Sequence, residues 1–425
     1  MKIPAVKGFR DVLPDESIRW WVLEERARAV FHRYNFREVR IPIVERTGLF
    51  QRSIGETTDI VEKEMYTFAD KDGTMLTLRP EGTASVVRAY VEHALAQHER
   101  VSKLYYFGPM FRRERPQKGR LRQFSQIGAE LLGRDDAAAD AETLLLLYDL
   151  LAAFAIEGAE VQLNSLGCHT CRPAYREALV TWGRAHFDEL CDDCRRRVDQ
   201  NPLRLLDCKQ PGCAAIRDSA PRMLDYLCAE CQAHFARVRE LLRREGVEPR
   251  LNPYMVRGLD YYCRTAFEVV ASGLGAQNAI GGGGRYDGLV RALGGPDVAG
   301  IGFALGVERL VMVLGERALE ADVRPEVVVL PVGEAAEALA VAVAHRWRTG
   351  GVRVEVESAG RSLKSQMRQA DKHGARFVVI VGEDELAGGA LTVRDMDARR
   401  DHPRALGVHL TAEELRAALA RLSAA

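Results

Sequence analysis

Six positively charged residues crowd a twelve-residue stretch of the chain, residues 111–122, whose sequence is FRRERPQKGRLR. Arg112 and Arg113 come directly after an apolar run, at the expected end of a β-strand. A strand end holds a guanidinium group in a fixed place, and guanidinium groups bind phosphate oxygens in pairs. A hairpin tip that is merely solvated would also be charged. The position at the strand end favours a site for a polyanion, such as ATP or the end of an RNA.

A second candidate site is the sequence RGLDYY at residues 257–262, which places Arg257, Asp260, Tyr261 and Tyr262 within six positions. Tyrosine rings can enclose a ligand ring and hydrogen-bond its polar edge, and a carboxylate can pair with a cationic or donor group. Tyrosine pairs also occur in strands for structural reasons alone. The residues by themselves leave both interpretations open.

Four consecutive glycines, Gly281 to Gly284, form a third candidate site together with the Arg-Tyr-Asp sequence that follows them. A flexible linker would also be rich in glycine. Apolar residues resume at Leu289, however, which favours a backbone that approaches a ligand closely. The segment lacks the Gly-Lys-Ser/Thr ending of a Walker loop. Residues 302–309 lack the spacing of a dinucleotide fingerprint, and their informative residue is Arg309, a cation on the helix expected to follow.

Eight of the nine cysteines fall into four pairs within an otherwise charged region, between about residues 165 and 245. The pairs are Cys168/Cys171, Cys191/Cys194, Cys208/Cys213 and Cys228/Cys231. The spacing of the first two pairs fits a four-thiolate structural zinc site of Cys168, Cys171, Cys191 and Cys194, and the other two pairs could form another. Reduced cysteines packed inside a helical module are the alternative. The sequence leaves the pairing open.

Hydrophobic periodicity predicts the elements that must position these residues. We expect a helix over residues 16–34, strands over 37–43 and 75–79, and a helix that Thr83 caps and that runs to about residue 93. Residues 105–107 and 122–127 should form an antiparallel hairpin around the arginine-rich loop. A leucine-rich helix over 140–155 follows, and strands with glycines return over 255–315.

The last hundred residues show a different order of elements. Strands over 327–330, 352–356 and 377–381 alternate with helices over 334–349 and 362–373, which indicates a small, mostly parallel sheet. We place the boundary near residues 321–325. The expected domains are a core of residues 1–164 and 246–322, an inserted cysteine-rich module of residues 165–245, and an α/β domain of residues 325–425.

Sixty basic residues balance sixty acidic residues, so the net charge of zero neither demands nor excludes a nucleic-acid partner. The first residues lack the apolar core of a signal peptide, and no apolar run approaches a membrane-spanning length. We therefore expect a cytoplasmic protein without a membrane partner. In that compartment cysteines are more often thiols or metal ligands than disulfides.

Together these segments resemble the class II aminoacyl-tRNA synthetases, and in particular the histidyl-tRNA synthetase family. Residues 37–45, 111–126 and 302–310 resemble the three motifs of the class, and TLRPEGT (residues 77–83), RGLDYY and GRYDG (residues 284–288) resemble segments of the histidine enzymes. The resemblance implies an α+β catalytic domain with an antiparallel sheet, a mainly helical insertion, a C-terminal α/β anticodon-binding domain and a homodimer. It also implies a histidine–tRNA ligase, which activates L-histidine with ATP and transfers it to the 3′ end of tRNA(His).

The resemblance further assigns roles to individual residues. The histidine pocket would comprise Glu81, Gly82, Thr83, Arg112, Gln126, Glu130, Arg257, Tyr261 and Tyr262. Glu81 and Thr83 would hold the α-amino group with Gln126 and Glu130 nearby, and the two tyrosines would surround the imidazole. The ATP-binding residues would be Arg112, Glu114, Phe124 and Arg309, with Mg²⁺ beside the β- and γ-phosphates. Arg257 and Arg112 would be catalytic, because they would stabilise charge at the α-phosphate.

The main alternative is a non-charging relative, the histidine-binding regulatory subunit of ATP phosphoribosyltransferase. Such proteins typically lack the anticodon-binding domain and an intact RGLDYY segment, and this chain has both. A dinucleotide-dependent oxidoreductase is disfavoured because no glycine fingerprint lies in a βαβ unit.

Overall fold

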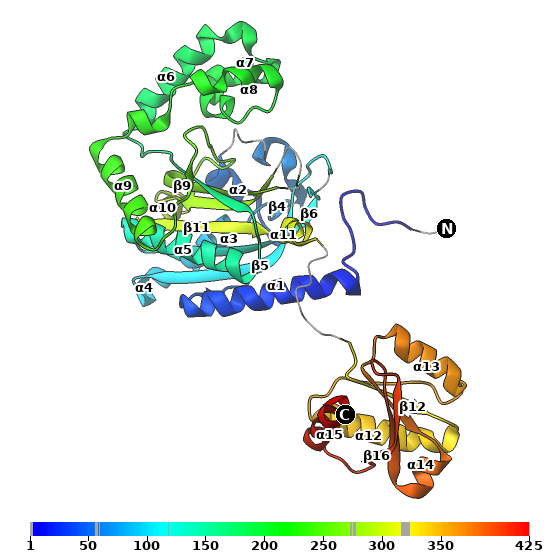
Figure 1. The fold of residues 1–425 in the computed structure, drawn as a ribbon. Helices are drawn as coiled ribbons and strands as arrows, with labels where there is room; N and C mark the ends of the chain where they lie inside the picture. Colours follow the sequence, from blue (N-terminus) through cyan, green and yellow to red (C-terminus); the bar gives the residue numbers. More distant parts are fainter. Residues whose placement is uncertain are drawn as a thin grey trace. The chain divides into compact units, whose positions relative to one another are not determined.

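The computed structural model describes residues 3–55, 58, 60–117, 119–272, 274, 278–315 and 324–424. The chain forms two compact units, residues 1–319 and 320–425 (Figure 1). Most of the segment in which the sequence places the domain boundary lies outside the described residues, as does Lys118 of the arginine-rich loop.

An eight-stranded sheet forms the centre of the first unit, in the order β1-β5-β6-β11-β10-β9-β7-β8. Its strands are β1 (Arg37–Glu38), β5 (Ser102–Phe111), β6 (Gln123–Leu132), β7 (Ala159–Ser165), β8 (Arg250–Leu251), β9 (Cys263–Ala271), β10 (Ala279–Arg285) and β11 (Gly300–Gly306). Only the outermost pairs among these strands are parallel, which confirms the predicted antiparallel α+β architecture. The predicted hairpin is present, since β5 and β6 pair from Ser102↔Leu132 to Phe111↔Gln123.

The predicted strand over 37–43 is shorter than expected. Pairing to β5 stops after β1, and the chain then turns past Pro42, which has no N–H to donate to a sheet. A separate antiparallel sheet follows, made of β2 (Val44–Arg46), β4 (Met75–Leu78) and β3 (Tyr66–Ala69). The π-helix Ile60–Glu64 precedes β3.

Two layers of helices cover the large sheet. One contains α1 (Pro14–Arg33), α5 (Ala137–Ala153), α9 (Ala229–Arg244) and α11 (Val307–Leu314), and the other contains α2 (Thr47–Ile54), α3 (Thr83–Glu92) and α10 (Leu289–Ala292). The short helix α4 (Leu95–His98) follows α3. Successive strand residues face opposite layers. Tyr105 stacks on Phe31 of α1 with 4.5 Å between ring centroids, whereas Tyr106 packs with Val86 of α3.

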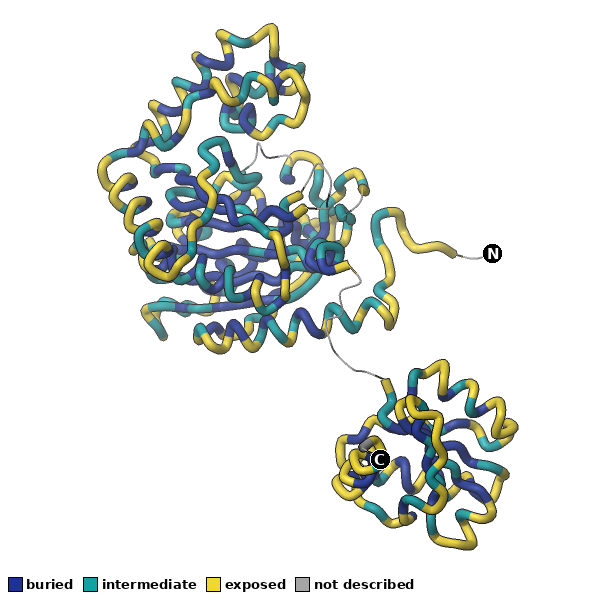
Figure 2. Tube along the Cα trace, in the orientation of Figure 1, coloured by how far each residue is buried: buried dark blue, intermediate teal, exposed yellow. Residues whose placement is uncertain are grey.

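Residues 165–245, called the insertion, are helical as predicted. They contain α6 (Arg172–Ala185), α7 (Asp192–Gln200), α8 (Pro211–Ile216) and α9, joined by the 3-10 turns Phe187–Glu189, Pro202–Leu205, Arg217–Ser219 and Met223–Tyr226. Buried residues between Cys171 and Cys231 form a hydrophobic cluster of their own. Figure 2 marks buried positions in this part of the chain. Four of the cluster's fourteen buried members are cysteines, so the thiols are part of the packing.

The second unit has a five-stranded sheet in the order β13-β12-β14-β15-β16. Its elements are β12 (Val327–Pro331), the 3-10 turn Glu334–Ala336, α12 (Glu337–Thr349), β13 (Val354–Val356), α13 (Leu363–Lys372), β14 (Phe377–Val381), α14 (Glu383–Gly388), β15 (Ala390–Asp395), β16 (Arg400–Gly407) and α15 (Ala412–Ala424). The first three strands are parallel, as predicted, whereas β15 and β16 form an antiparallel hairpin that the sequence did not reveal. The edge strand β16 is polar and contains Pro403, which an edge tolerates, so its sequence does not alternate like a buried strand. Among the described residues, no helix has both the length and the apolar character needed to cross a membrane.

Candidate active site

A cavity of about 220 Å³ lies on the α3 side of the large sheet, beside the ends of β5, β6 and β10. Every residue that the sequence assigned to histidine or ATP lines it, except Gly82 and Glu130. The lining residues among those predicted are Glu81, Thr83, Arg112, Glu114, Phe124, Gln126, Arg257, Tyr261, Tyr262 and Arg309. The structure therefore brings together side chains that lie up to 228 positions apart in the sequence, from 81 to 309.

Glu81 caps helix α3, and not Thr83 as the sequence suggested. The two carboxylate oxygens of Glu81 accept hydrogen bonds from the backbone N–H groups of Thr83 (2.7 Å) and Ala84 (2.8 Å). Thr83 is already the first helical residue, so its hydroxyl is free to point elsewhere. Burial raises the pKa of Glu81, and the two N–H groups oppose that rise. The carboxylate is thus held in a fixed orientation at the cavity wall.

Glu130 lies behind the cavity wall. Its carboxylate is fully buried and accepts hydrogen bonds from the hydroxyls of Thr83 (2.6 Å) and Tyr286. Burial raises the pKa of Glu130 to about 8. Glu130 therefore positions Thr83 from beneath, and it does not line the cavity beside the expected amino group.

The raised pKa of Glu130 predicts a pH-dependent stability. The ordinary pKa of a glutamate is 4.5. Between pH 4.5 and about pH 8, Glu130 is therefore protonated in the folded protein but ionised in the unfolded chain. This contribution to stability is complete below pH 4.5 and declines until the pH passes about 8. We expect the melting temperature of Glu130→Gln to fall less than that of the wild type between pH 6 and pH 9, as measured by calorimetry. An equal fall in both proteins would contradict the assignment.

The end of the cavity near α3 is aromatic and contains unpaired polar atoms. The rings of Tyr261 and Tyr262 lie 4.7 Å apart, and Tyr106 lines the same end. The hydroxyls of Tyr106 and Tyr261 and the side-chain oxygen of Gln126 are buried without a hydrogen-bond partner among the described residues. A buried polar atom without a partner is costly, so a ligand with a polar ring and an ammonium group fits this end.

Tyr106 was not among the residues that the sequence assigned to the site. Two glycines, Gly82 and Gly128, lie against its ring. A Cβ atom at Gly82 or at Gly128 would lie 2.3 Å or 2.2 Å from the Tyr106 ring. Both positions must therefore be glycine for the ring to reach the cavity. Gly82, predicted as a histidine-binding residue, acts in this structure by leaving room for Tyr106.

Removing either unpaired tyrosine hydroxyl should affect ligand binding but not stability. Tyr106→Phe and Tyr261→Phe break no hydrogen bond within the described residues, so we expect melting temperatures within about 2 °C of the wild type, since a larger shift would require on the order of 1 kcal/mol. The KM for histidine, the ligand that the resemblance implies, should rise roughly tenfold, because a lost ligand hydrogen bond costs about 1–2 kcal/mol. An unchanged KM in both variants would remove these hydroxyls from the ligand site.

Two anchored cations also line the cavity. Arg112 donates from Nε to the carbonyl oxygen of Pro80 (2.9 Å) and lies over the Phe124 ring at 5.2 Å. Arg309 donates from Nε to the carbonyl oxygen of Gly119 (3.0 Å), and burial lowers the pKa of Arg309. Arginine remains charged in proteins even so. The two guanidinium groups are therefore anchored by backbone oxygens and suited to bind phosphate.

Near these cations, Arg120 forms an ion pair with Glu114 at 2.9 Å. Glu114 is thereby held at the cavity, where its second oxygen lies 3.9 Å from Arg112. Sequence analysis placed Arg120 in the arginine-rich loop without giving it this role.

Arg257 occupies the middle of the cavity wall. Its Nη1 pairs with Glu268 of β9 at 2.9 Å, and its guanidinium lies 5.6 Å from the centre of the Tyr262 ring. The Nε of Arg257 has no hydrogen-bond partner among the described residues. A mostly buried, oriented cation whose Nε donor has no partner among the described residues is suited to bind an anionic group of a ligand.

The glycine run is the central strand β10, not a linker. A Cβ atom at Gly282 would lie 2.7 Å from Nη1 of Arg257 and 2.6 Å from the carbonyl oxygen of Phe267. The absence of a side chain at Gly282 therefore creates the space in which the Arg257 guanidinium lies. Gly281 and Gly282 also line the cavity, in agreement with the expected close approach of backbone to a ligand.

This contact predicts a sharp difference between two glycines. Gly282→Ala should lower the histidine activation that the resemblance implies by about a hundredfold, because a small misplacement of a positioned group costs that much. Gly288→Ala, whose Cβ would meet no atom within 4 Å, is the matched control and should keep near-wild-type activity. Pyrophosphate exchange measures both variants, and equal activities would show that Gly282 does not position Arg257.

Arg285 of the GRYDG sequence supports the site from within the core. It is fully buried and forms ion pairs with Asp140 of α5 and with Asp287 (2.8 Å). His234 of α9 approaches the other oxygen of Asp140 at 2.8 Å. Asp140 thus links the large sheet to the last helix of the insertion, and Arg285 does not reach the cavity.

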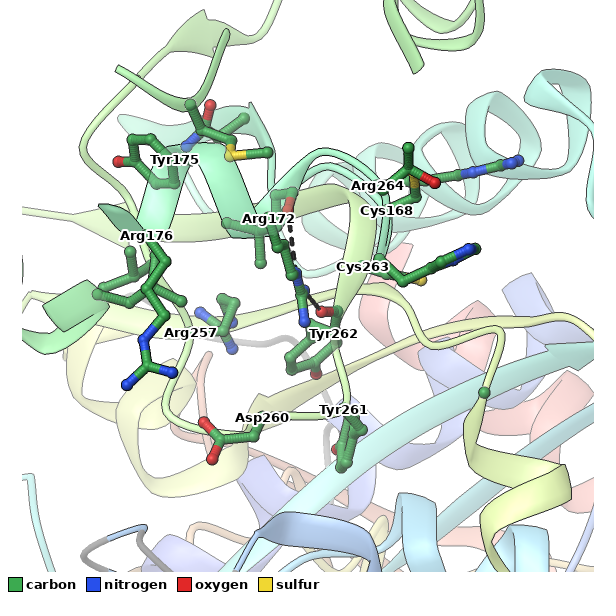
Figure 3. A pocket seen from close by; sticks show the side chains of 18 of the residues that line it. Cys168, Arg172, Tyr175, Arg176, Arg257, Asp260, Tyr261, Tyr262, Cys263 and Arg264 are labelled. Atoms are coloured by element: carbon green, nitrogen blue, oxygen red, sulfur yellow. Dashed lines mark hydrogen bonds between the residues drawn. The ribbon is translucent and has the colours of Figure 1, made fainter. Parts of the chain in front are cut away.

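A larger cavity, of about 1340 Å³, lies between the insertion and the RGLDYY segment (Figure 3). Tyr261, Tyr262 and Arg257 line both cavities, whereas Asp260 lines only the larger one. Arg172 of α6 donates to the carbonyl oxygen of Tyr262, and Arg204 donates to that of Gly258 at 3.0 Å. Two arginines of the insertion therefore hold the segment that carries the tyrosines.

The cysteines are grouped differently from the spacing-based prediction. Cys168 and Cys171 lie with Cys228 and Cys231, and Cys191 and Cys194 lie with Cys208 and Cys213. The predicted set of Cys168, Cys171, Cys191 and Cys194 is therefore wrong as a single site. The physical reason is that α6 separates the first two pairs, while the chain returns at the start of α9 to bring Cys228 and Cys231 beside the first pair.

Comparison with known proteins agrees with this arrangement. A family model described as Histidyl-tRNA synthetase matches residues 8–310. The chain belongs to the histidyl-tRNA synthetase family. A second model, described as Anticodon binding domain, matches residues 326–422, which form most of the second unit.

Individual members of the histidyl-tRNA synthetase family are similar over almost the whole chain. The histidine–tRNA ligase of Trichlorobacter lovleyi is 52% identical over 419 residues, which cover 99% of each chain. The apo structure of S. aureus histidyl-tRNA synthetase has a TM-score of 0.78 and 35% identity, and covers 95% of this chain and 96% of that one. A structure from Bacillus halodurans, described as an ATP phosphoribosyltransferase regulatory subunit/histidyl-tRNA synthetase, has a TM-score of 0.66 over 90% of this chain and 99% of that one. Its identity of 20% establishes a shared fold only.

Proposed function

We propose that this chain, a histidine–tRNA ligase, forms histidyl-adenylate in the smaller cavity and then transfers histidine to tRNA(His). The observation that carries the proposal is the division of this cavity into two ends. Unpaired hydroxyls lie among the tyrosines at one end, where Tyr262 approaches β10 at Gly284. Arg309 donates to the carbonyl oxygen of Ala279 at the other end of β10, and Arg257 lies against Gly282 between them. A reaction between a small polar amino acid and a nucleotide needs this arrangement.

Histidine would bind at the tyrosine end. The carboxylate of Glu81 would accept from its α-ammonium group beside Thr83 and Gln126, and the hydroxyls of Tyr106 and Tyr261 would meet the nitrogen atoms of its imidazole. Tyr262, whose ring is tilted by 52° against that of Tyr261, would form the wall. Discrimination would be strong, because an amino acid without polar ring atoms would leave buried hydroxyls unpaired.

ATP would bind as its magnesium complex at the arginine end. Phe124, which lies under the Arg112 guanidinium, would stack on the adenine, and the oriented Glu114 would accept from the adenine edge. Arg309 would hold the γ-phosphate. These roles need fixed cations, and the backbone bonds of Arg112 and Arg309 support them.

The reaction joins a carboxylate oxygen of histidine to the α-phosphorus of ATP and breaks the bond to pyrophosphate. Negative charge builds on the non-bridging oxygens of the α-phosphate as the new bond forms. Arg112 and Arg257 would stabilise this charge without reorganisation, because both are held in place before the substrates bind. Holding the two substrates in line would supply much of the remaining acceleration.

The second unit would bind the anticodon of tRNA(His), since it matches an anticodon-binding model. Unpaired RNA bases are usually read by stacking and by hydrogen bonds to their edges. A homodimer and a cytoplasmic location complete the proposal by analogy with the family. Zinc bound by the insertion would be structural, because none of the cysteines is among the residues that line the smaller cavity.

Amino-acid-dependent exchange of pyrophosphate into ATP tests the first step. Among the twenty standard amino acids, we expect histidine alone to stimulate exchange. Stimulation by another amino acid, or exchange by none, would contradict the assignment of the cavity. The non-charging regulatory alternative is not favoured, because identity to histidine–tRNA ligases covers both units.

A further inference from the structure

Two groups of four thiols in the insertion have the geometry of metal centres. In each group the four sulfur atoms lie within 4.8 Å of one another. Neighbouring sulfurs are 3.6 Å (Cys168–Cys171), 3.9 Å (Cys168–Cys228) and 3.8 Å (Cys191–Cys208) apart. A tetrahedral zinc ion with sulfur atoms at about 2.3 Å requires about 3.8 Å between sulfurs, whereas a disulfide requires about 2.05 Å. The spacing therefore fits zinc tetrathiolates and excludes disulfides.

Backbone groups also point at these sulfurs. The N–H of Cys228 donates to Sγ of Cys171 (3.1 Å), and the N–H of Cys191 donates to Sγ of Cys213 (3.2 Å). Such bonds lower the charge on a metal-bound thiolate and orient it. Each group contains one of these two hydrogen bonds, so in both groups a backbone N–H group orients a sulfur atom that could bind a metal.

The insertion also needs reinforcement beyond its apolar packing. Its short helices and 3-10 turns bury a small core in which four of the fourteen buried members are cysteines. A module of about eighty residues with such a core gains stability from a structural metal.

The group of Cys168, Cys171, Cys228 and Cys231, called the proximal group, is tied to the histidine end of the cavity. Arg172, directly after Cys171, donates to the carbonyl oxygen of Tyr262 (Figure 3). Backbone bonds join Leu166 and Gly167, just before Cys168, to Arg264 at 2.6 and 2.8 Å. Glu230, between Cys228 and Cys231, pairs with the same Arg264.

We infer that the insertion binds two zinc ions, one in each group of four thiols, and that the ion of the proximal group holds Tyr262 and its neighbours in position to bind histidine. The first half of this inference is independent of the proposed function, and the second half rests on it. The proximal ion joins the start of α6, which follows β7 of the large sheet, to the start of α9, which packs on α5. The hydrogen bonds and the ion pair to residues 262–264 described above all come from residues within two positions of a cysteine of the proximal group.

The zinc content of the full-length protein, purified without chelator, tests the first half. We expect two zinc ions per chain by mass spectrometry, and X-ray absorption should show four sulfur neighbours at about 2.3 Å. One zinc or none per chain, or iron in its place, would overturn the inference. These measurements need no variant, so they decide the matter even if a cysteine variant fails to fold.

Cysteine variants test the grouping. Cys168→Ser and Cys191→Ser should each retain one zinc ion, whereas Cys263→Ser, which alters the ninth cysteine outside both groups, should retain two. Two ions in Cys168→Ser, or one in Cys263→Ser, would overturn the grouping.

Substrate dependence tests the second half. In Cys168→Ser the KM for histidine in pyrophosphate exchange should rise by about tenfold or more, because displaced tyrosines weaken the binding of the substrate that they contact. The KM for ATP should stay within about threefold of the wild type. An unchanged KM for histidine, or an equal rise for both substrates, would contradict the positioning role. Failure of the proposed function would look different, since wild-type protein would then show no histidine-dependent exchange while its zinc content stayed at two.

Discussion

Arg257→Ala is expected to lower histidine-dependent pyrophosphate exchange by about a hundredfold to a thousandfold, as removal of a preorganised donor does in other enzymes, while the protein stays folded. The guanidinium group of Arg257 lies between the two ends of the cavity and is aligned by Glu268 and the Tyr262 ring. Stability should change little, because the side chain of Glu268 is 30% exposed and can be solvated when its partner is lost. The loss should therefore appear in the chemical step and not in the melting temperature.

Two control variants sharpen this prediction. Arg257→Lys keeps the charge but loses the planar fork, so its activity should lie between those of the wild type and Arg257→Ala. Arg291→Ala removes an exposed arginine of the larger cavity that pairs with Asp297, and its activity should remain near the wild-type value. Exchange by Arg257→Ala within tenfold of the wild type would show that this arginine does not act on the α-phosphate.

Deletion of residues 325–425 should separate the two halves of the reaction. The second unit is compact by itself and contributes no residue to the smaller cavity as described. Pyrophosphate exchange should therefore stay within about threefold of the wild type, whereas charging of tRNA(His) at low tRNA concentration should fall by about a hundredfold or more. The reason is that a tethered second binding module raises affinity by about 10²–10⁴.

The isolated fragment 325–425 provides the control for this deletion. Added in trans it should not restore charging, because the gain depends on the tether. An equal loss of exchange and charging in the truncated protein would assign the second unit a structural role.

The parts of the site that depend on short stretches of sequence could be predicted from the sequence. The alternating residues of β5 and β6 and the arginines at their ends identify a hairpin that presents cations, and the structure confirms the hairpin. By contrast, β10 is a strand made largely of glycines, which have little tendency to form strands. Its place in the sheet follows from the tight packing of β9 and β11 on either side, and glycine content alone cannot reveal such packing.

The grouping of the cysteines and the role of Tyr106 could not be predicted from the sequence. Spacing along the chain suggested that Cys168 and Cys171 join Cys191 and Cys194, but a helix carries the second pair away and a distant turn brings in another. Tyr106 looked like one of three aromatic residues in a strand, and its contacts with Val86, Gly82 and Gly128 identify the face on which it lies. Both outcomes depend on tertiary contacts between residues far apart in the sequence.

Charging of tRNA(His) with radiolabelled histidine by the purified full-length protein tests the central claim most directly. We predict histidyl-tRNA formation that requires ATP and that no other standard amino acid supports. Binding of histidine without transfer to tRNA would contradict this account and indicate a regulatory protein built on the same fold.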